Sequence, residues 1–240
     1  MKPVLILQHQ VPENAAYLTT WLNRHGIAYE TRNAGNGDEF PASIEPYAAL
    51  AVMGGGMSAN DDLESNRQAE QLIVQAMILD IPVIGHCLGG QLMSRALKGS
   101  VTIAPTPEIG WQPIEYEAKP QVDEWFGTDP TNTVIHWHYE TFSVPDGATL
   151  LASSAACLNQ AWALGNNLAM QFHIEMNIRK CEAWVKDDDE LWSQARTQYD
   201  TVQDAETIIA GINPYLLQHQ KTADNIYRHW LSLSEYSERL

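Results

Sequence analysis

A cysteine between glycines follows a short apolar run in the first half of the chain. Ile81–Gly85 leads into His86 and Cys87, and the sequence then reads Leu-Gly-Gly-Gln before a helical pattern. A strand that turns sharply into a helix exposes the residue at the turn, and small neighbours give its strained backbone room. The first amides of the helix would favour a thiolate. This segment predicts a nucleophile at Cys87; the alternative interpretation is a buried structural cysteine at a βα turn.

A histidine and a glutamate stand at the end of another apolar run. Leu168–Phe172 is followed by His173 and, two residues later, by Glu175. Because alternate residues of an extended chain point the same way, Glu175 can bind one ring nitrogen and leave the other for a nucleophile. Cys87, His173 and Glu175 would then form a catalytic triad. By itself, His-x-Glu at the end of a strand is more often ordinary surface polarity, so this interpretation depends on the cysteine.

Three glycines follow a third apolar run. Ala51–Met53 breaks into Gly54, Gly55 and Gly56. Such a loop can turn a backbone N–H toward the oxyanion that develops in acyl transfer, with the N–H of Leu88 as the second donor. A phosphate-binding loop is the competing interpretation, but the Gly-Lys-Ser/Thr ending and the GxGxxG spacing are both missing.

In the first half of the chain, short β-prone runs alternate with helical patterns, and these elements must position the residues named above. Such alternation is typical of a parallel sheet with covering helices. The expected strands are Val4–Gln8, Ile27–Thr31, Ala48–Met53 and Ile81–Gly85, the expected helices are Ala15–Arg24 and Leu63–Leu79, and a turn is expected at 11–14.

Beyond Lys98 the pattern changes to short β-prone runs with few helices between them, which predicts hairpins added to the main sheet. From about residue 177 the pattern is helical, with a loop or helix start at Lys186–Glu190 and a break expected at Pro214. The expected hairpin strands are Val101–Ala104, Gln112–Tyr116, Thr133–Trp137, Thr149–Ser153, Gln160–Ala163 and Leu168–Phe172; the expected helices are Ile178–Val185, Asp189–Asp200, Ala205–Ile212 and Tyr215–Leu233.

Composition narrows the class of protein. The 240 residues hold 14 Lys and Arg against 30 Asp and Glu, a formal charge of -16, which argues against a nucleic-acid partner. With 45% apolar residues the chain can bury a core. It has no apolar run of about 20 residues, so we expect a cytoplasmic protein without a membrane contact. Three cysteines without CxxC spacing suggest neither a disulfide framework nor a zinc knuckle.

Taken together, these segments resemble the class I, or triad, glutamine amidotransferase family. The elbow GHCLGGQL, the preceding glycine loop and the later QFHIE occur in that family's order. Pro107–Trp111 and His136–Phe142 are similar to its branch that includes the glutaminase portion of GMP synthase. The resemblance covers residues 1–176, which we expect to form the catalytic domain, with 177–240 as a helical extension packed on it.

The resemblance implies a fold, a reaction and further site residues. The fold is a flavodoxin-like open sheet, mostly parallel, with flanking helices. Cys87 would attack the side-chain amide of glutamine to form a γ-glutamyl thioester, with His173 as the proton shuttle and Glu175 orienting it. Gly55 and Leu88 would supply the oxyanion amides. Substrate contacts are expected from Gln91, His138 and Tyr139.

Three departures from the family pattern bear on the substrate. Gly56 and Ile174 each stand where relatives often have proline. The replacement at 174 should not change the direction of the His173 and Glu175 side chains. The family's His-Gly-Asp reads His-Tyr-Glu at 138–140. Because Tyr139 replaces a residue that often lies against the substrate, a reshaped pocket and a different γ-glutamyl compound come into consideration.

His136 and His138 lie two residues apart on an expected strand and invite a metal interpretation beside His173. Zinc would need a further ligand and a supporting shell, which the sequence does not reveal. We therefore expect no metal and no cofactor, and treat both histidines as substrate lining or packing. The tryptophans of the tail, among them Trp184, are expected to anchor it to the body of the protein.

Three functions are compatible with these residues. The first is a glutamine amidotransferase or glutaminase that releases ammonia, with a separate synthetase protein as a possible acceptor. The second is a γ-glutamyl peptidase that uses the same triad on a larger leaving group. The third is a catalytically silent binding or regulatory protein that keeps the fold.

Overall fold

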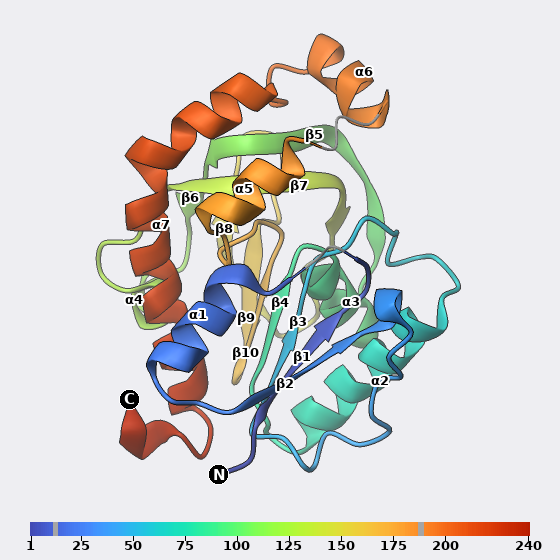
Figure 1. The fold of residues 1–240 in the computed structure, drawn as a ribbon, viewed down its shortest axis with the longest axis vertical. Coiled ribbons are helices and arrows are strands. Elements are labelled where there is room, and N and C mark those ends of the chain that lie inside the picture. Colours follow the sequence, from blue (N-terminus) through green and yellow to red (C-terminus); the bar gives the residue numbers. More distant parts are fainter. Residues whose placement is uncertain (12–13, 187–189) are drawn as a thin grey trace.

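The computed structural model describes residues 1–11, 14–186 and 190–240 and contains an eight-stranded sheet (Figure 1). The strand order is β2-β1-β3-β4-β10-β9-β8-β6; strands from β2 to β10 pair in parallel, and those from β10 to β6 pair antiparallel. These strands are β1 (Val4–Gln8), β2 (Tyr29–Asn33), β3 (Ala49–Val52), β4 (Val83–His86), β6 (Glu115–Tyr116), β8 (Thr149–Ser153), β9 (Ala161–Leu164) and β10 (Asn167–Met170).

Helices cover both faces of this sheet. Figure 1 places α1 and α7 on one side and α2 and α3 on the other. The described α-helices are α1 (Ala16–Arg24), α2 (Glu64–Ile78), α3 (Leu88–Ala96), α4 (Lys119–Phe126), α5 (Ile178–Trp184), α6 (Glu190–Gln198) and α7 (Ala205–Ser232).

Alternation along β1 explains the two layers. Val4 and Ile6 enter a hydrophobic cluster with residues of α1 and α7, whereas Leu5 and Leu7 enter another with residues of α2 and α3. Every residue of β1 is buried, as expected for a parallel strand with helices on both faces. The predicted α/β fold, with its mostly parallel sheet, added antiparallel strands and helical C-terminal segment, is confirmed.

A separate two-stranded antiparallel sheet consists of β5 (Val101–Pro113) and β7 (Thr133–Phe142). Its register shifts between Ile103 and Glu108. Beyond that shift, Ile109 and Trp111 pack in a third hydrophobic cluster with residues of α5, α6 and the start of α7. Figure 1 shows the same neighbourhood at the top of the molecule, where α5 and α6 lie beside β5 and β7. This sheet is therefore the platform for the C-terminal helices.

The predicted helix break at Pro214 is wrong. Pro214 lies inside α7, which continues to Ser232 and changes direction along its length (Figure 1). Proline removes one backbone hydrogen bond and bends a helix, but it does not separate two halves that are both held by packing. Ile208 before the proline and Leu216 after it enter the same hydrophobic cluster. Helix α4 lies in a region where few helices were expected.

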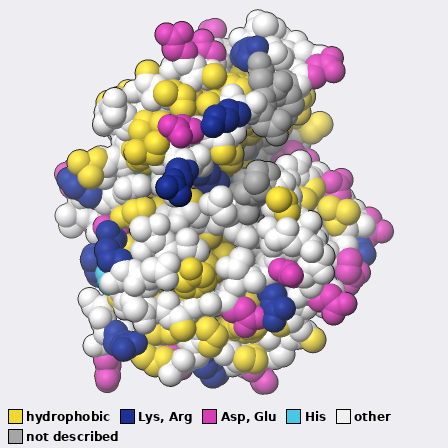
Figure 2. All heavy atoms as spheres, in the orientation of Figure 1, with side chains coloured by type: hydrophobic (Ala, Val, Ile, Leu, Met, Phe, Trp, Pro, Cys, Tyr) yellow, Lys and Arg dark blue, Asp and Glu magenta, His cyan; other side chains and the backbone are white. Residues whose placement is uncertain are grey.

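Two predicted loops fall partly outside the described residues: the turn at 11–14 includes residues 12 and 13, and the loop at Lys186–Glu190 includes residues 187–189. None of the helices in the described parts of the chain is both long and apolar enough to cross a membrane. On the face drawn in Figure 2, Asp and Glu side chains gather over α2, while Lys and Arg side chains gather over α5. The negative charge of the protein is therefore unevenly distributed.

A methyl group at Gly89 should disrupt the contact between α3 and the sheet. Its Cβ would overlap the carbonyl oxygen of Val52 and lie 2.6 Å from the carbonyl carbon, both of which are backbone atoms of β3. We expect Gly89→Ala to lower the free energy of unfolding by about 3 kcal/mol, at the upper end of overpacking costs. Urea denaturation measures this difference.

Gly26→Asn is the matched control, because Gly26 has a φ of +63° but no atom within 4 Å of an added Cβ. Asparagine tolerates this backbone region, so the cost should be smaller than at Gly89. Equal losses in the two variants would contradict the steric explanation.

Candidate active site

Cys87 occupies a strained turn between β4 and α3. Its φ is 49° and its ψ is -109°, an unfavourable conformation for a residue with a side chain. The surroundings leave no room for larger residues, since a Cβ on Gly85 would lie 2.6 Å from the backbone of Gly89. The close approach of α3 to β3 and β4 imposes this turn, which is the strand-to-helix elbow expected from the sequence.

The Cys87 sulfur lies at the N-terminus of α3. The Cys87 carbonyl accepts the first helical hydrogen bond, from the amide of Gln91 at 3.0 Å. The side-chain amide of Gln171 donates to the sulfur at 3.6 Å, and the thiol donates to the backbone oxygen of Trp137 at the same distance. Cys87 is 6% exposed. The sulfur is thus surrounded by polar groups and almost closed off from water.

His173 and Glu175 form the second part of the site, just beyond β10. His173 Nδ1 donates to Glu175 Oε1 at 2.8 Å. A Cβ on Gly54 would lie 2.7 Å from His173 Cε1 and 3.6 Å from Cys87 Cβ, so both side chains meet beneath the glycine loop. The structure therefore brings together Cys87, His173 and Glu175, which lie far apart in the sequence.

Electrostatics favour a protonated His173. Burial alone would lower the pKa of His173, but the Glu175 carboxylate and a hydrogen bond with Cys87 raise it to about 10. Burial likewise opposes ionisation of Glu175, yet Lys180 and then His173 hold its pKa well below the usual value. The arrangement thus suits an imidazolium beside the Glu175 carboxylate.

His86 lies on the other side of Glu175. Its Nε2 is 3.9 Å from Glu175 Oε2, and its side chain is fully buried. Burial lowers the pKa of His86 to about 4, so the ring is neutral near pH 7. His219 of α7 holds the backbone of the site, because its Nε2 donates to the carbonyl oxygen of His173 at 2.9 Å.

The glycine loop runs over the start of α3. A Cβ on Gly55 would lie 2.9 Å from Leu88 Cδ2, which makes these two residues neighbours. The loop is held from outside, since the amide of Gly56 donates to the side-chain oxygen of Gln10 at 2.9 Å. The expected donors, Gly55 and Leu88, are therefore adjacent, and their role in binding an oxyanion stays a prediction.

The three predicted substrate contacts occupy different surroundings. Gln91 is buried near the site, where its amide donates to the backbone oxygen of Glu140 at 3.3 Å and lies 3.5 Å from Gln171 Oε1. On β7, His138 points toward Glu108, whereas Tyr139 packs against the third hydrophobic cluster. His138 and Tyr139 thus do not line one common surface, and the substrate roles of all three residues stay predictions.

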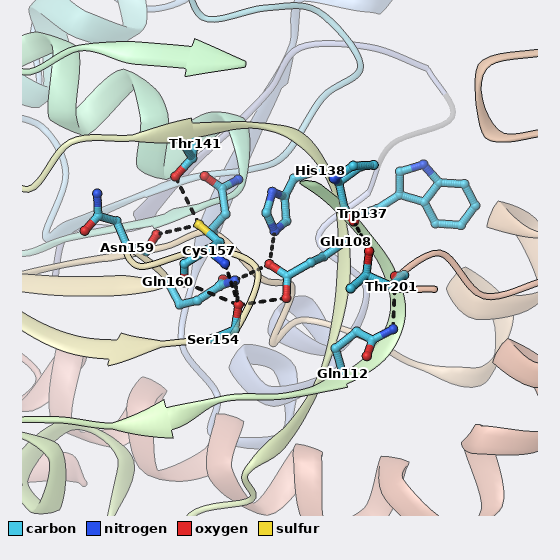
Figure 3. Close-up of polar contacts among 12 residues, drawn as sticks. Glu108, Gln112, Trp137, His138, Thr141, Ser154, Cys157, Asn159, Gln160 and Thr201 are labelled. Atoms are coloured by element: carbon cyan, nitrogen blue, oxygen red, sulfur yellow. Dashed lines mark hydrogen bonds and ion pairs between the residues drawn. The ribbon is translucent and has the colours of Figure 1, made fainter. Parts of the chain in front are cut away.

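A buried polar cluster lies beside β7 (Figure 3). Glu108, His136 and His138 each bring one possible metal ligand within 4.8 Å of the others. Glu108 already accepts hydrogen bonds from His138 at 3.1 Å and Gln160 at 2.6 Å on one oxygen, and from Ser154 at 2.8 Å on the other. Because protein donors occupy both carboxylate oxygens, the cluster is satisfactorily explained as a hydrogen-bond network that joins β5, β7 and the start of β9.

Sequence patterns alone did not reveal three residues of the site. Gln171 belongs to the quoted QFHIE segment, and its place two residues before His173 could have indicated it. Lys180 gave no signal in sequence, because a single lysine in a helical pattern is usually exposed. Trp184 was expected only to anchor the tail, but its ring packs edge-on against that of His173 with centroids 4.6 Å apart.

The fold is the one that solved glutamine amidotransferases have. The chain belongs to the glutamine amidotransferase class-I family, whose profile matches residues 23–187. The family resemblance inferred from the sequence motifs is therefore confirmed, and with it a glutamine amidotransferase-type function.

Named relatives fall into two groups. A putative glutamine amidotransferase-like protein of Salmonella typhimurium, YfeJ, is 30% identical over 187 residues, which are 74% of this chain and 77% of that protein. GMP synthase of Bacillus pumilus is 35% identical over 127 residues, which are 52% of this chain but only 24% of that enzyme. One subunit of the glutamine-hydrolysing GMP synthase from Saccharolobus solfataricus is 28% identical over 55% of this chain and 70% of its own length.

Solved structures extend the similarity over the C-terminal helices. A glutamine amidotransferase from Methylobacillus flagellatus superposes with a TM-score of 0.93 and 35% identity, covering 98% of this chain and 96% of that one. A glutamine amidotransferase from Thermotoga maritima has the same fold, with a TM-score of 0.85 at 22% identity over 96% and 98% of the two chains. The helices beyond residue 177 are thus part of a fold that other proteins share.

The raised pKa of His173 predicts a loss of stability at alkaline pH. Between its unfolded value near 6.5 and its folded value of about 10, the native protein binds more protons at this group than the unfolded chain does. The resulting stabilisation is complete below pH 6.5 and disappears as the pH rises through 10. In urea denaturation between about pH 7 and 10, the wild type should lose more stability than His173→Gln. Parallel curves for the two proteins would contradict the raised pKa.

Proposed function

We propose that this protein hydrolyses the side-chain amide of glutamine through a γ-glutamyl thioester on Cys87. The observation that carries this proposal is the meeting of Cys87, His173 and Glu175 at the strand-to-helix elbow. A nucleophile, a proton carrier and an orienting carboxylate in this order are the components that acyl transfer requires. The family of the chain supports glutamine as the acyl donor.

The reaction begins with an attack of the Cys87 thiolate on the amide carbon of glutamine. The resulting tetrahedral intermediate carries a negative oxygen, which the backbone amides of Gly55 and Leu88 would stabilise. His173 gives its proton to the nitrogen, the carbon–nitrogen bond breaks, and ammonia leaves. What remains is the thioester, with His173 now neutral.

Hydrolysis of the thioester reverses the proton transfer. Neutral His173 takes a proton from water, the hydroxide attacks the thioester carbon, and the carbon–sulfur bond breaks. Glutamate leaves, and the pair of thiolate and imidazolium is restored. Glu175 stays ionised throughout and keeps the Nδ1–H of His173 directed toward itself, so that Nε2 serves both steps.

We further propose that ammonia passes to a separate synthetase protein. Support comes from the relatives: the similar part of Bacillus pumilus GMP synthase is 24% of that enzyme, and the Saccharolobus solfataricus relative is named as one subunit of a GMP synthase. Such a partner would dock where the site opens. The partner would bind the molecule that accepts the ammonia, and the hydrolysis of glutamine itself does not require that molecule.

Cys87→Ser should abolish turnover of glutamine while the protein stays folded, because the exchange of sulfur for oxygen is nearly isosteric. We expect a loss of at least about 10³-fold in kcat, since removal of a nucleophile removes the covalent route. Glu175→Gln should lose less, because nucleophile and base remain. Coupled assays that follow glutamate and ammonia separately measure both variants; hydrolysis at the wild-type rate in Cys87→Ser would identify the wrong nucleophile.

A panel of substrates distinguishes the competing functions. Purified protein is offered glutamine, γ-glutamyl dipeptides and asparagine, and we expect the highest kcat/KM for glutamine. Tyr139, in place of the family's glycine, is the feature that favours the γ-glutamyl peptidase, and a preference for dipeptides would establish that function instead. If no substrate is turned over and a glutamine-like electrophile does not label Cys87, the results would support a catalytically silent binding protein.

A further inference from the structure

A buried lysine contacts the carboxylate of the triad. Lys180 lies in the first turn of α5, where its amide donates to the N-cap side chain of Asn177 at 2.9 Å. Its ammonium turns inward and donates to Glu175 Oε1 at 2.9 Å and to the backbone oxygen of Asn14 at 3.0 Å. Lys180 is 4% exposed, whereas its neighbour Arg179 is exposed. A lysine is rarely buried to this extent without a partner that requires its charge.

Lys180 and His173 share one oxygen atom. Glu175 Oε1 accepts from His173 Nδ1 at 2.8 Å and from Lys180 Nζ at 2.9 Å, and Glu175 is fully buried. An isolated carboxylate in such a place would take up a proton and would then stabilise the imidazolium much less. The ammonium opposes this, so the ionised state of Glu175 depends on α5.

Among the described residues, the other titratable groups around the triad do not supply this charge. Burial lowers the pKa values of His86 on β4 and His219 on α7 to about 4, and that of His136 on β7 to about 3. Burial raises the pKa of Tyr227 on α7 well above its usual value, so this phenol is also neutral. Cys87 on the elbow would add a negative charge as a thiolate. Among these groups, Lys180 and His173 are the cations that face Glu175.

We propose that Lys180 is a positioning residue of the triad, which keeps Glu175 ionised and fixes Oε1 against His173; this inference rests on the proposed function. The same helix also places Trp184 against the ring of His173. Lys180 and Trp184 are four residues apart, and the ammonium lies 5.2 Å from the centre of the Trp184 ring. One short helix thus contacts both the carboxylate and the imidazole.

Removal of the ammonium should make the thiolate of Cys87 harder to form. Without the ammonium, Glu175 would be protonated more readily and would hold the imidazolium of His173 less firmly. The thiolate of Cys87 would then lose part of the stabilisation that the imidazolium gives it.

The test uses Lys180→Gln, which removes the charge but keeps a hydrogen-bond donor, and Lys180→Arg, which keeps the charge. Arg179→Gln is the matched control, because it removes an exposed cation from the same helix. Alkylation of Cys87 by iodoacetamide, which reacts with the thiolate, is followed by mass spectrometry of its peptide from about pH 5 to 9. Because the readout is specific to this peptide, Cys157 and Cys181 do not interfere.

In Lys180→Gln we expect the pH of half-maximal alkylation to rise by about one unit, because the imidazolium beside the sulfur is held less firmly. The kcat for glutamine should fall about tenfold near pH 7 with little change in KM, because Lys180 is buried and acts through Glu175. Lys180→Arg should recover most of both values, and Arg179→Gln should match the wild type. An unshifted alkylation profile in Lys180→Gln would overturn the proposal.

A double variant shows whether Lys180 acts through Glu175. In a Glu175→Gln background there is no carboxylate to position, so Lys180→Gln should shift the alkylation profile much less than it does in the wild type. An equal shift in both backgrounds would overturn the proposal. If Lys180→Gln alone does not fold, Glu175→Gln is compared with the double variant, in which neither charge is left unpaired; a shift of about one unit between these two would overturn the proposal.

Failure of this inference is distinguishable from failure of the proposed function. Alkylation requires no substrate, so the profiles report on Lys180 even if the wild type does not hydrolyse glutamine. Hydrolysis of glutamine with identical kcat and alkylation profiles in wild type and Lys180→Gln would retain the function and reject the role of Lys180.

Discussion

The buried negative charge of Glu175 is the constraint on which this site depends. The side chain has no access to water, and a carboxylate in such a place is stable only when cations and donors surround it. His173 and Lys180 provide them from two different segments. The backbone oxygen of Glu175 is also bound, by the amide of Tyr17 in α1 at 2.8 Å. Segments from both halves of the chain therefore converge on one residue.

The position of the Cys87 sulfur depends on a steric constraint instead. The elbow at Cys87 requires α3 to approach β3 and β4 so closely that Gly85 and Gly89 admit no side chain. Burial of the alternating apolar residues on both faces of the sheet supplies the free energy that holds this strained turn. The site thus combines a packing constraint on the sulfur with a charge constraint on the imidazole.

The features of the fold and of the site that depend on local sequence could be predicted. Alternation of β-prone and helical runs predicted the sheet, and Cys87, His173 and Glu175 stand in recognisable short segments. The break predicted at Pro214 was wrong because packing on both sides of a proline is a tertiary effect. Lys180 was missed for a similar reason: its contacts with Glu175 and Asn14 come from folding, whereas its sequence neighbours Ile178 and Arg179 are exposed.

The hydrogen bond from His219 to the carbonyl of His173 has a consequence for biosynthesis. A ribosome makes the chain from the N-terminus, so the elbow and the glycine loop emerge long before α5 and α7. Until these helices are made and docked, Glu175 lacks its ammonium and His173 its backbone anchor. In a nascent chain, Cys87 would therefore stand without an anchored His173 beside it through most of translation, until the last of these helices has been synthesised.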